Sequence, residues 1–403
     1  MNKIISASKK HRTLLVIGIL MISSTLRVPF TAAAPLLDMV REAFSLTTAQ
    51  VGLLTTLPLL AFAVVSPMVA GIARRIGTEP SLFCALLIIC LGIVVRSSAN
   101  VALLYIGTAI IGCGIAMGNV LLPSVIKRDF AGDVAKLTGA YSLTMGIAAA
   151  IGSVSVVPIA LYGFGWSGSL LSLLIFPLLA LVIWIPQLRH SQKVNLSTNP
   201  ALQSRGVWSS MLAWQITLYL GLNSFIYYVM VGWLPSILMS FGYSEQQAGS
   251  VHAVLQLATA VPGLFIGLVL SRLKDQRFIA ILMAIMWTSC VLGMWGWPKL
   301  ATLWIFIGGF GSGAGFILGL SFIALRTGSA HQAAALSGMA QCVGYLLAAF
   351  GPPLMGKIHD LSGSWSLPLL ILAILTLLMA TFGAYSGRQV QIGSPATQKK
   401  EPA

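Results

Sequence analysis

An arginine interrupts the first long apolar run of the chain. Arg27 lies within residues 13–34, which are otherwise apolar or weakly polar and are long enough to cross a bilayer. A cation at such a depth costs roughly 2.5–3.5 kcal/mol on insertion scales. This cost is reduced if the helix faces a polar interior in which a negative or strongly dipolar group meets the guanidinium. Arg27 therefore indicates binding or passage of a small, anion-like solute.

Small polar residues share one helical face with Arg27. Ser24, Arg27 and Thr31 follow an i, i+3, i+7 spacing, so we expect this face to point into a central cavity. Pro29 and Pro35 are expected to loosen the helix nearby, because proline cannot donate a backbone hydrogen bond. The structural alternative is that Arg27 only binds carbonyls or polar side chains of neighbouring helices.

No acidic residue accompanies Arg27 inside the apolar runs. All nine Asp and Glu residues fall in predicted loops or at the ends of runs. The sequence therefore predicts an electropositive cavity for anions or electron-rich neutral solutes, and it shows no carboxylate proton relay. His252 is the one imidazole expected to titrate near the pathway. The alternative for His252 is a hydrogen-bonded interfacial histidine.

The seventh apolar run carries a second polar stripe. Tyr219, Asn223 and Tyr227 are spaced i, i+4 and i+8, and Asn223 and Tyr227 lie near mid-depth, where they could orient a planar solute. Further candidates in other runs are Asn119, Tyr141, Gln256, Gln341 and Tyr345. For each of these, hydrogen bonding between helices is an equally good interpretation, because polar groups commonly join membrane helices.

Composition defines the elements that must position these residues. The 403 residues are 57% hydrophobic and only 8% charged, whereas soluble proteins carry about 25% charged residues. The apolar runs do not alternate, which excludes a β-barrel. We therefore predict an all-α membrane protein with twelve spans. The spans are residues 13–34, 48–71, 80–98, 101–125, 138–160, 167–187, 209–238, 246–270, 278–297, 302–325, 332–355 and 366–386.

The basic residues predict the orientation of these spans. With the N-terminus inside, cytoplasmic segments hold 19 Lys and Arg, and the outer loops hold only Arg41, Arg96, Lys299 and Lys357. This asymmetry is the positive-inside signal, with both termini cytoplasmic. The formal charge of +15 forms no basic stripe with aromatics, so nucleic-acid binding is not expected. The five cysteines show no pairing or metal-ligand spacing, and no cofactor is expected.

The chain reads as two related halves. Gly112-Cys-Gly114 recurs as Gly311-Ser-Gly313, and Leu137-Thr-Gly139 recurs as Leu336-Ser-Gly338, both at an offset of 199 residues. We predict an N-terminal six-helix half at 1–187, a cytoplasmic linker at 188–208, a C-terminal half at 209–386 and a tail at 387–403. The fourth and tenth spans are rich in glycine, which predicts that these helices pack closely against their neighbours. This organisation is typical of major facilitator transporters, which bind solute at the midplane.

Eight stretches of the chain form a recognisable pattern: Leu26–Thr31, Ala34–Leu37, Leu54–Pro58, Leu122–Arg128, Tyr141–Gly146, Gly242–Glu245, His331–Gly338 and Gly351–Asp360. They resemble the cyanate/2-nitroimidazole permease family of the major facilitator superfamily, and most closely its nitroimidazole-transporter branch. The resemblance covers essentially the whole chain. It implies a bacterial inner-membrane permease for a small solute, in which the first-span arginine of the family corresponds to Arg27.

The chain departs from the superfamily pattern in two places. The loop after the second span usually reads G-x-x-x-D-R-x-G, but here Ala70 and Arg74 replace the first glycine and the aspartate. This puts the usual charge pairing of that loop in question. The fifth span lacks the Gly-Pro step that follows glycine in drug–proton antiporters, at both Gly146 and Gly152. That absence disfavours a drug pump.

Together these features predict a secondary-active, alternating-access transporter of a small planar solute. The expected partners are the solute and the lipid bilayer, and we expect a monomer. The rival functions are an exporter of toxic heterocycles and, less favoured, a non-transporting membrane sensor. An enzyme is not expected, because the spans contain no nucleophile–base pair and no metal-like cluster of His, Asp and Glu.

Overall fold

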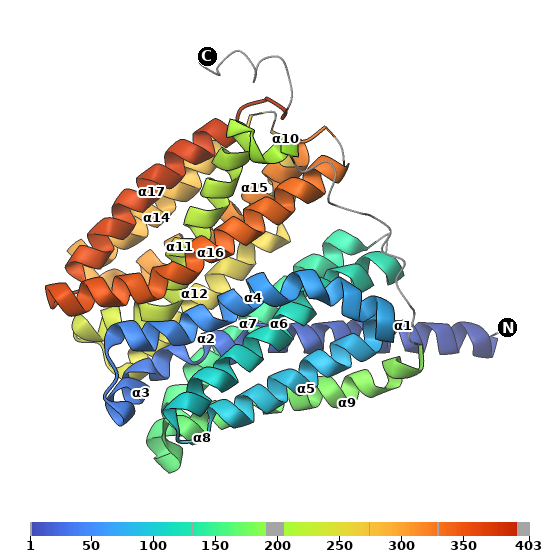
Figure 1. Cartoon of the computed structure of the whole chain (residues 1–403), viewed down its shortest axis with the longest axis horizontal. Helices are drawn as coiled ribbons and strands as arrows, with labels where there is room; N and C mark the ends of the chain where they lie inside the picture. Colours follow the sequence, from blue (N-terminus) through green and yellow to red (C-terminus); the bar gives the residue numbers. More distant parts are fainter. Residues whose placement is uncertain (1, 131–132, 191–204, 274, 329, 393–403) are drawn as a thin grey trace. The chain divides into compact units, whose positions relative to one another are not determined.

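A computed structural model describes residues 2–130, 133–190, 205–273, 275–328 and 330–392. These residues form helices and turns, with no strand among them (Figure 1). The predicted all-α class is therefore confirmed. The described chain divides into two compact units, each described by itself. Most of the predicted linker, and the end of the predicted tail, lie outside the described residues.

Unit 1 comprises Met1–Leu46, Leu53–Leu196 and Glu245–Ala253. Its main helices are α1 (Asn2–Thr25), α2 (Val28–Thr31), α3 (Leu37–Phe44), α4 (Thr48–Ile76), α5 (Thr78–Arg96), α6 (Val101–Asp129), α7 (Val134–Ile159), α8 (Gly165–Ser172) and α9 (Ile175–Trp184). Short 3-10 or π segments are η1 (Ala34–Leu36), η2 (Ala160–Phe164) and η3 (Ile185–His190).

Unit 2 comprises Thr47–Gly52, Ser197–Ser244 and Val254–Ala403. Its helices are α10 (Arg205–Trp208), α11 (Met211–Ser240), α12 (Glu245–Ala260, in part), α13 (Ile266–Ser271), α14 (Arg277–Gly296), α15 (Ala301–Leu325), α16 (Ala330–Ser362) and α17 (Ser366–Ser386). The 3-10 segments are η4 (Val261–Leu264) and η5 (Pro298–Leu300). Helix α11 continues through Pro235, so the long seventh span is one helix.

Ten helical segments of the described chain are long and apolar enough to cross a membrane. The fifth and sixth predicted spans merge into one apolar run, Lys136–Arg189, although Gly163 and Gly165 interrupt it with positive φ values of 107° and 62°. The eighth predicted span is not among these ten, and it is divided into α12, η4 and α13, with Pro262 in η4. The count of twelve therefore stays a prediction.

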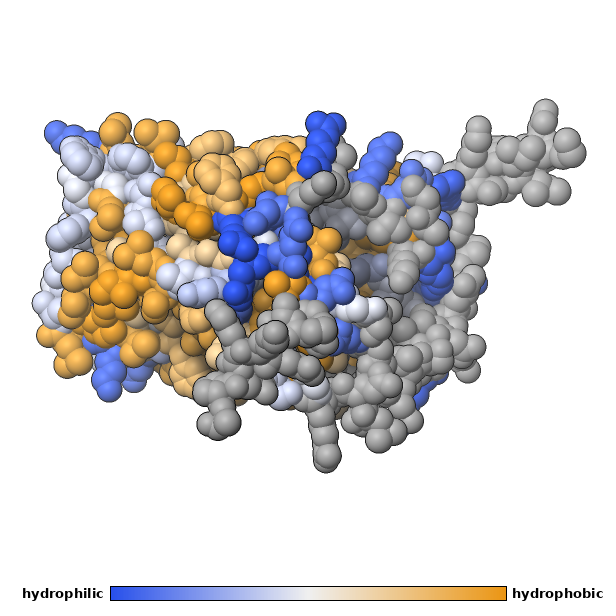
Figure 2. Space-filling view, turned by 90° about the horizontal axis from the view of Figure 1, so that it is seen from above, coloured by the Kyte–Doolittle hydropathy of each residue, from blue (hydrophilic) through white to orange (hydrophobic). Residues whose placement is uncertain are grey.

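Large apolar side chains cover the outside of these helices. Examples are Val64, Val182 and Leu377, which are 67%, 66% and 58% exposed. Figure 2 shows hydrophobic residues spread over much of the face in view. Soluble proteins rarely expose continuous apolar patches of this kind. In a bilayer these side chains contact lipid instead of water, so their exposure carries no hydrophobic penalty. This is expected for helices that span a membrane.

Glycines set the closest helix contacts inside each unit. In unit 1, a Cβ at Gly107 of α6 would lie 2.6 Å from the Cα of Arg96 and 2.7 Å from the carbonyl oxygen of Gly92, both on α5. In unit 2, a Cβ at Gly308 of α15 would lie 2.6 Å from Cys290 of α14. Only glycine permits such approaches, so the predicted close packing by glycine is confirmed.

Candidate functional site

The first membrane segment is broken at Arg27. Helix α1 ends at Thr25, and α2 begins only at Val28. Pro29 explains this break, because it has no N–H to donate to the carbonyl of Thr25, four residues earlier. Pro35 acts in the same way on Thr31, where α2 ends. Two prolines thus leave a short helix between two interruptions, and Arg27 lies at the first of them.

Backbone geometry at the break is well defined. Arg27 has φ −127° and ψ −42°, outside helical values. Its carbonyl accepts from Phe30 N at 3.2 Å, from Thr31 N at 3.0 Å and from the Thr31 hydroxyl at 3.1 Å. The side chain of Arg27 is half-buried. The guanidinium also follows the C-terminal end of α1, whose partial negative charge favours a cation by about 0.3–1 kcal/mol.

Neighbouring helices of unit 1 hold the break by close packing. A Cβ at Gly118 of α6 would lie 2.3 Å from Cδ2 of Leu26. A Cβ at Gly152 of α7 would lie 2.9 Å from the Cβ of Ala32 and 3.0 Å from Cγ1 of Val28. Irregular backbone at membrane depth is tolerated where protein buries it or where it lines a cavity. These contacts supply the burial.

Arg96 is the residue that sequence analysis misplaced. It was assigned to an outer loop, but it forms the last turn of α5 and is only 2% exposed. Its Nη1 donates to the carbonyl of Pro29, two residues beyond Arg27. A residue at the end of an apolar run is normally counted with the following loop. The sequence feature that could have shown the burial of Arg96 is the pair Gly92 and Gly107, because these glycines let the end of α5 pack closely against α6.

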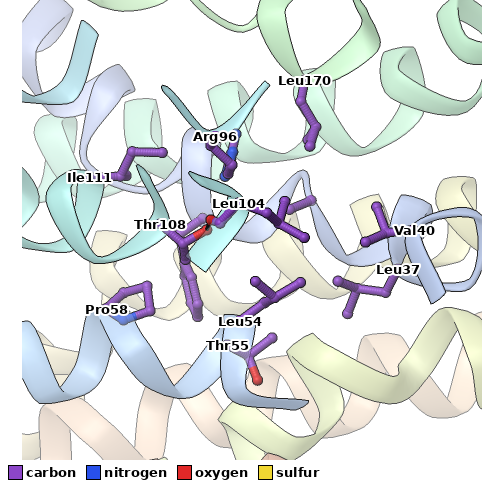
Figure 3. A pocket seen from close by; sticks show the side chains of 12 residues that line it. Leu37, Val40, Leu54, Thr55, Pro58, Arg96, Leu104, Thr108, Ile111 and Leu170 are labelled. Carbon is purple, nitrogen blue, oxygen red and sulfur yellow. Dashed lines mark hydrogen bonds between the residues drawn. The ribbon is translucent and has the colours of Figure 1, made fainter. Parts of the chain in front are cut away.

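A small cavity of about 20 Å³ adjoins Arg96. The remainder of its lining is apolar apart from Thr55 and Thr108. Figure 3 shows Arg96 beside Leu104 and Thr108 of α6, with Leu54, Thr55 and Pro58 of α4 across the cavity. The Thr108 hydroxyl donates to the Leu104 carbonyl at 2.7 Å.

The other predicted residues of unit 1 have different surroundings. The Ser24 hydroxyl donates to the Met21 carbonyl at 2.7 Å, and the Thr31 hydroxyl donates to the Arg27 carbonyl. Both hydroxyl protons therefore serve their own helical segment, and only their oxygens can accept a bond. Asn119 of α6 is exposed, and Tyr141 of α7 is half-buried.

His252 is fully buried in unit 1. Its Nδ1 lies 2.9 Å from the Ser153 hydroxyl oxygen, and Ser153 donates to the Ala149 carbonyl at 2.8 Å. A hydroxyl has only one proton, so this arrangement makes His252 Nδ1–H the donor to Ser153. The hydrogen-bonded alternative thus describes the observed contact, and a role in proton coupling stays a prediction.

In unit 2, Asn223 joins three helices. It is 2% exposed, its Nδ2 donates to the Ser312 carbonyl at 3.2 Å, and its Oδ1 accepts from Trp287 Nε1 at 3.2 Å. These bonds connect α11 with α15 and α14. Both ends of the amide therefore bind neighbouring helices. This agrees with the alternative interpretation, in which polar residues of the spans join helices to one another.

The remaining candidates of unit 2 include one hydrogen-bonded pair. The half-buried Tyr227 donates from its hydroxyl to Oε1 of the buried Gln256 at 3.2 Å. The exposed Gln341 donates from Nε2 to the Ser337 hydroxyl at 3.0 Å within α16. Tyr345 is half-buried on the same helix. Of the predicted stripe, Tyr227 is half-buried, whereas Tyr219 and Asn223 are buried.

Tyr219, one turn before Asn223, provides a stability test. It is fully buried, and its hydroxyl has no hydrogen-bond partner among the described residues. Because an unmade buried hydrogen bond costs about 1–3 kcal/mol, Tyr219→Phe is expected to raise the melting temperature of the purified protein. Tyr227→Phe, which removes the bond to Gln256, is the matched control and should lower it. A lower melting temperature for Tyr219→Phe would show that the hydroxyl has a partner.

Two polar networks at helix ends match across the sequence repeat. In unit 1, Arg128 Nη2 binds Glu79 at 2.6 Å and Asp129 at 2.7 Å. In unit 2, Arg326 Nη2 binds Gln276, and its guanidinium donates to the carbonyls of Ser386 and Gly387 at 3.0 Å. Gln276 follows Glu79 by 197 residues and Arg326 follows Arg128 by 198. Glu79 thus supplies a charge pair although the preceding loop lacks the usual aspartate.

Comparison with known proteins decides the family. The model of the Major Facilitator Superfamily matches residues 14–296. The chain belongs to this superfamily. It is 64% identical to the 2-nitroimidazole transporter of Escherichia coli (strain K12), over 96% of this chain and 98% of that protein. It is 24% identical to the cyanate transport protein CynX of the same organism, over 86% and 90% of the two chains.

The fold of this major facilitator transporter agrees with solved structures. It matches a mutant form of the nucleoside transporter NupG with a TM-score of 0.77 at 14% identity, over 93% of this chain and 100% of that chain. Membership in the cyanate/2-nitroimidazole permease family is confirmed. The chain is therefore a multi-pass membrane transporter, and both of these relatives are named as transporters of small solutes.

Proposed function

We propose that this transporter moves a small planar solute, anionic or electron-rich, through a bacterial inner membrane by alternating access. The observation that carries the proposal is the break of the first membrane segment at Arg27. Discontinuous membrane helices commonly form the solute sites of secondary transporters. The family of the chain supplies a second, independent support.

The chemistry of Arg27 suits such a solute. A guanidinium offers five N–H donors in a planar arrangement and stays charged at physiological pH. The names of two relatives specify 2-nitroimidazole and cyanate. Both solutes are small and delocalised and accept hydrogen bonds. A planar acceptor of this kind would match the donors of Arg27 more closely than a bulky cationic drug would.

Other groups have assigned roles in the proposal. In unit 1, Ser24, Thr31, Asn119 and Tyr141 remain candidates for solute contact, with Arg27 as the principal group. In unit 2, Tyr227 is favoured over Asn223, because both ends of the Asn223 amide already bind protein groups. Gln256, Gln341 and Tyr345 are secondary candidates. We assign proton coupling to His252, and we place both termini of a monomeric protein in the cytoplasm.

Transport by purified protein tests the proposal. Proteoliposomes should take up 2-nitroimidazole faster than empty liposomes, and cyanate or benzoate should compete, whereas neutral benzene derivatives without an acceptor group should not. Uptake measured with and without an imposed pH gradient identifies coupling to protons. If none of these solutes is transported or competes, the proposed solute class is wrong.

Direction of transport requires a separate experiment. An importer of 2-nitroimidazole should sensitise overexpressing cells to the compound, because it raises the internal concentration. An exporter of toxic heterocycles, the alternative, should protect them. The control is a strain that expresses the Arg27→Ala variant at the same level. Greater resistance in the wild-type strain would favour the export function.

A further inference from the structure

One edge of the Arg96 guanidinium, formed by Nε and Nη2, has no hydrogen-bond partner among the described residues, and we call it the open edge. Nη1 binds the Pro29 carbonyl, whereas Nε and Nη2 are buried without a hydrogen-bond partner among the described residues. No carboxylate from the described chain pairs with Arg96 or lines the adjoining cavity. A buried charged group in a stable protein normally has all its donors satisfied. Among the described residues, this edge of the guanidinium therefore lacks an acceptor.

The open edge has a definite chemical preference. Nε–H and one N–H of Nη2 point in parallel from the guanidinium, the geometry that binds two oxygens of one planar group. The cavity of about 20 Å³ has room for one or two water-sized groups, but not for an aromatic ring. Its other walls are apolar, apart from two threonines. These properties select a small terminal group with two oxygens.

We propose that Arg96 and this cavity form a second anion site, which takes a planar two-oxygen group such as a carboxylate or a nitro group. The group belongs to a small free anion or to the transported solute itself, and the second source rests on the proposed function. The contact of Arg96 with Pro29 connects this site to the break at Arg27. An occupant of the site would therefore also stabilise the Arg96 side chain that holds the broken segment.

Two substitutions separate this site from Arg27. Arg96→Lys keeps the charge but loses the two-donor edge. Thr108→Leu leaves Arg96 intact and fills the cavity, because Thr108 lines it. Thr108→Val is the matched control, since it has the shape of threonine and does not fill the space. Arg27→Ala removes the other arginine, and every variant is first checked for a single species by size-exclusion chromatography.

A thermal-shift measurement with sodium formate tests the site. Sodium chloride at equal ionic strength is the control, because chloride is a spherical anion without two oxygens. Formate well above its Kd should raise the melting temperature of the wild type by about 2–4 °C. The same shift is expected in Thr108→Val and Arg27→Ala. It should disappear in Arg96→Lys and in Thr108→Leu.

Three outcomes would overturn the proposal. They are a wild type that formate does not stabilise, a formate effect that survives both Arg96→Lys and Thr108→Leu, and stabilisation by chloride as strong as that by formate. Loss of the shift only in Arg27→Ala would assign the anion to Arg27 instead. Competition between formate and 2-nitroimidazole identifies the group of the solute as the occupant, whereas additive stabilisation identifies a free anion. Because formate binding needs no transport, failure of the proposed function leaves this result unchanged.

Discussion

Replacing Arg27 with alanine is expected to reduce solute transport by about 30-fold or more. Removing one partner of a buried, hydrogen-bonded charge pair costs roughly 2–5 kcal/mol, and each 1.4 kcal/mol corresponds to a factor of ten. Arg27→Lys should be intermediate, because the ammonium keeps the charge but cannot offer two parallel donors. Initial uptake rates in proteoliposomes, normalised to the amount of reconstituted protein, provide the measurement.

A second arginine of the same segment serves as the control. Arg12 lies on α1 in an exposed ion pair with Asp133 at 3.1 Å, and such pairs contribute about 0–1 kcal/mol. Arg12→Ala should therefore retain the wild-type rate. Wild-type transport by both Arg27→Ala and Arg27→Lys, at normal expression, would remove Arg27 from the solute site. If Arg27→Lys restored the melting temperature but not transport, the guanidinium would act on the solute and not only on the end of α1.

Part of this site was predictable because its cause lies in local sequence. Pro29 and Pro35 remove backbone donors four residues after Thr25 and Thr31, and both helices end at those residues. Yet proline alone is insufficient, since α11 passes through Pro235 without a break. The sequence predicts a weakened helix at Arg27, and neighbours such as Gly118 and Gly152 provide the burial that makes an open break tolerable.

Arg96 was not predictable by the same argument, because its burial depends on contact between two helices. Hydropathy places it at the end of an apolar run, where an arginine normally reaches water. The backbone approach of α6 at Gly107 encloses the end of α5 instead. Asn223 shows the opposite case. Its mid-depth position suggests a solute ligand, but Trp287 and Ser312 supply the partners of its amide.

The family was easier to predict than the site. Apolar runs of about 20 residues, separated by basic loops, depend on the thickness of the bilayer and not on tertiary packing. The number of spans is harder to read where the backbone is irregular. The run Lys136–Arg189 holds two predicted spans, and Gly163 and Gly165 lie between them with positive φ, whereas the eighth predicted span is divided into α12, η4 and α13. Irregular backbone therefore limits both the span count and the assignment of the site.

Gly107→Ala is expected to lower stability by about 1–3 kcal/mol, the usual cost of overpacking a tight contact. The new methyl group would meet backbone atoms of Arg96 and Gly92, which cannot move aside as a flexible side chain can. Gly71→Ala on α4 is the matched control, because a Cβ there has no atom within 4 Å. Alanine favours a helix interior over glycine by about 1 kcal/mol, so the control should be neutral or slightly stabilised.

The melting temperature in detergent measures this difference, and formate adds a second readout. Separation of α5 from α6 would displace Arg96 from the Pro29 carbonyl, so Gly107→Ala should also weaken stabilisation by formate. Gly71→Ala should keep it. Equal melting temperatures for the two variants would show that the helices can part without cost. In that case the burial of Arg96 would not depend on the glycine contact, and the position of its open edge would need another cause.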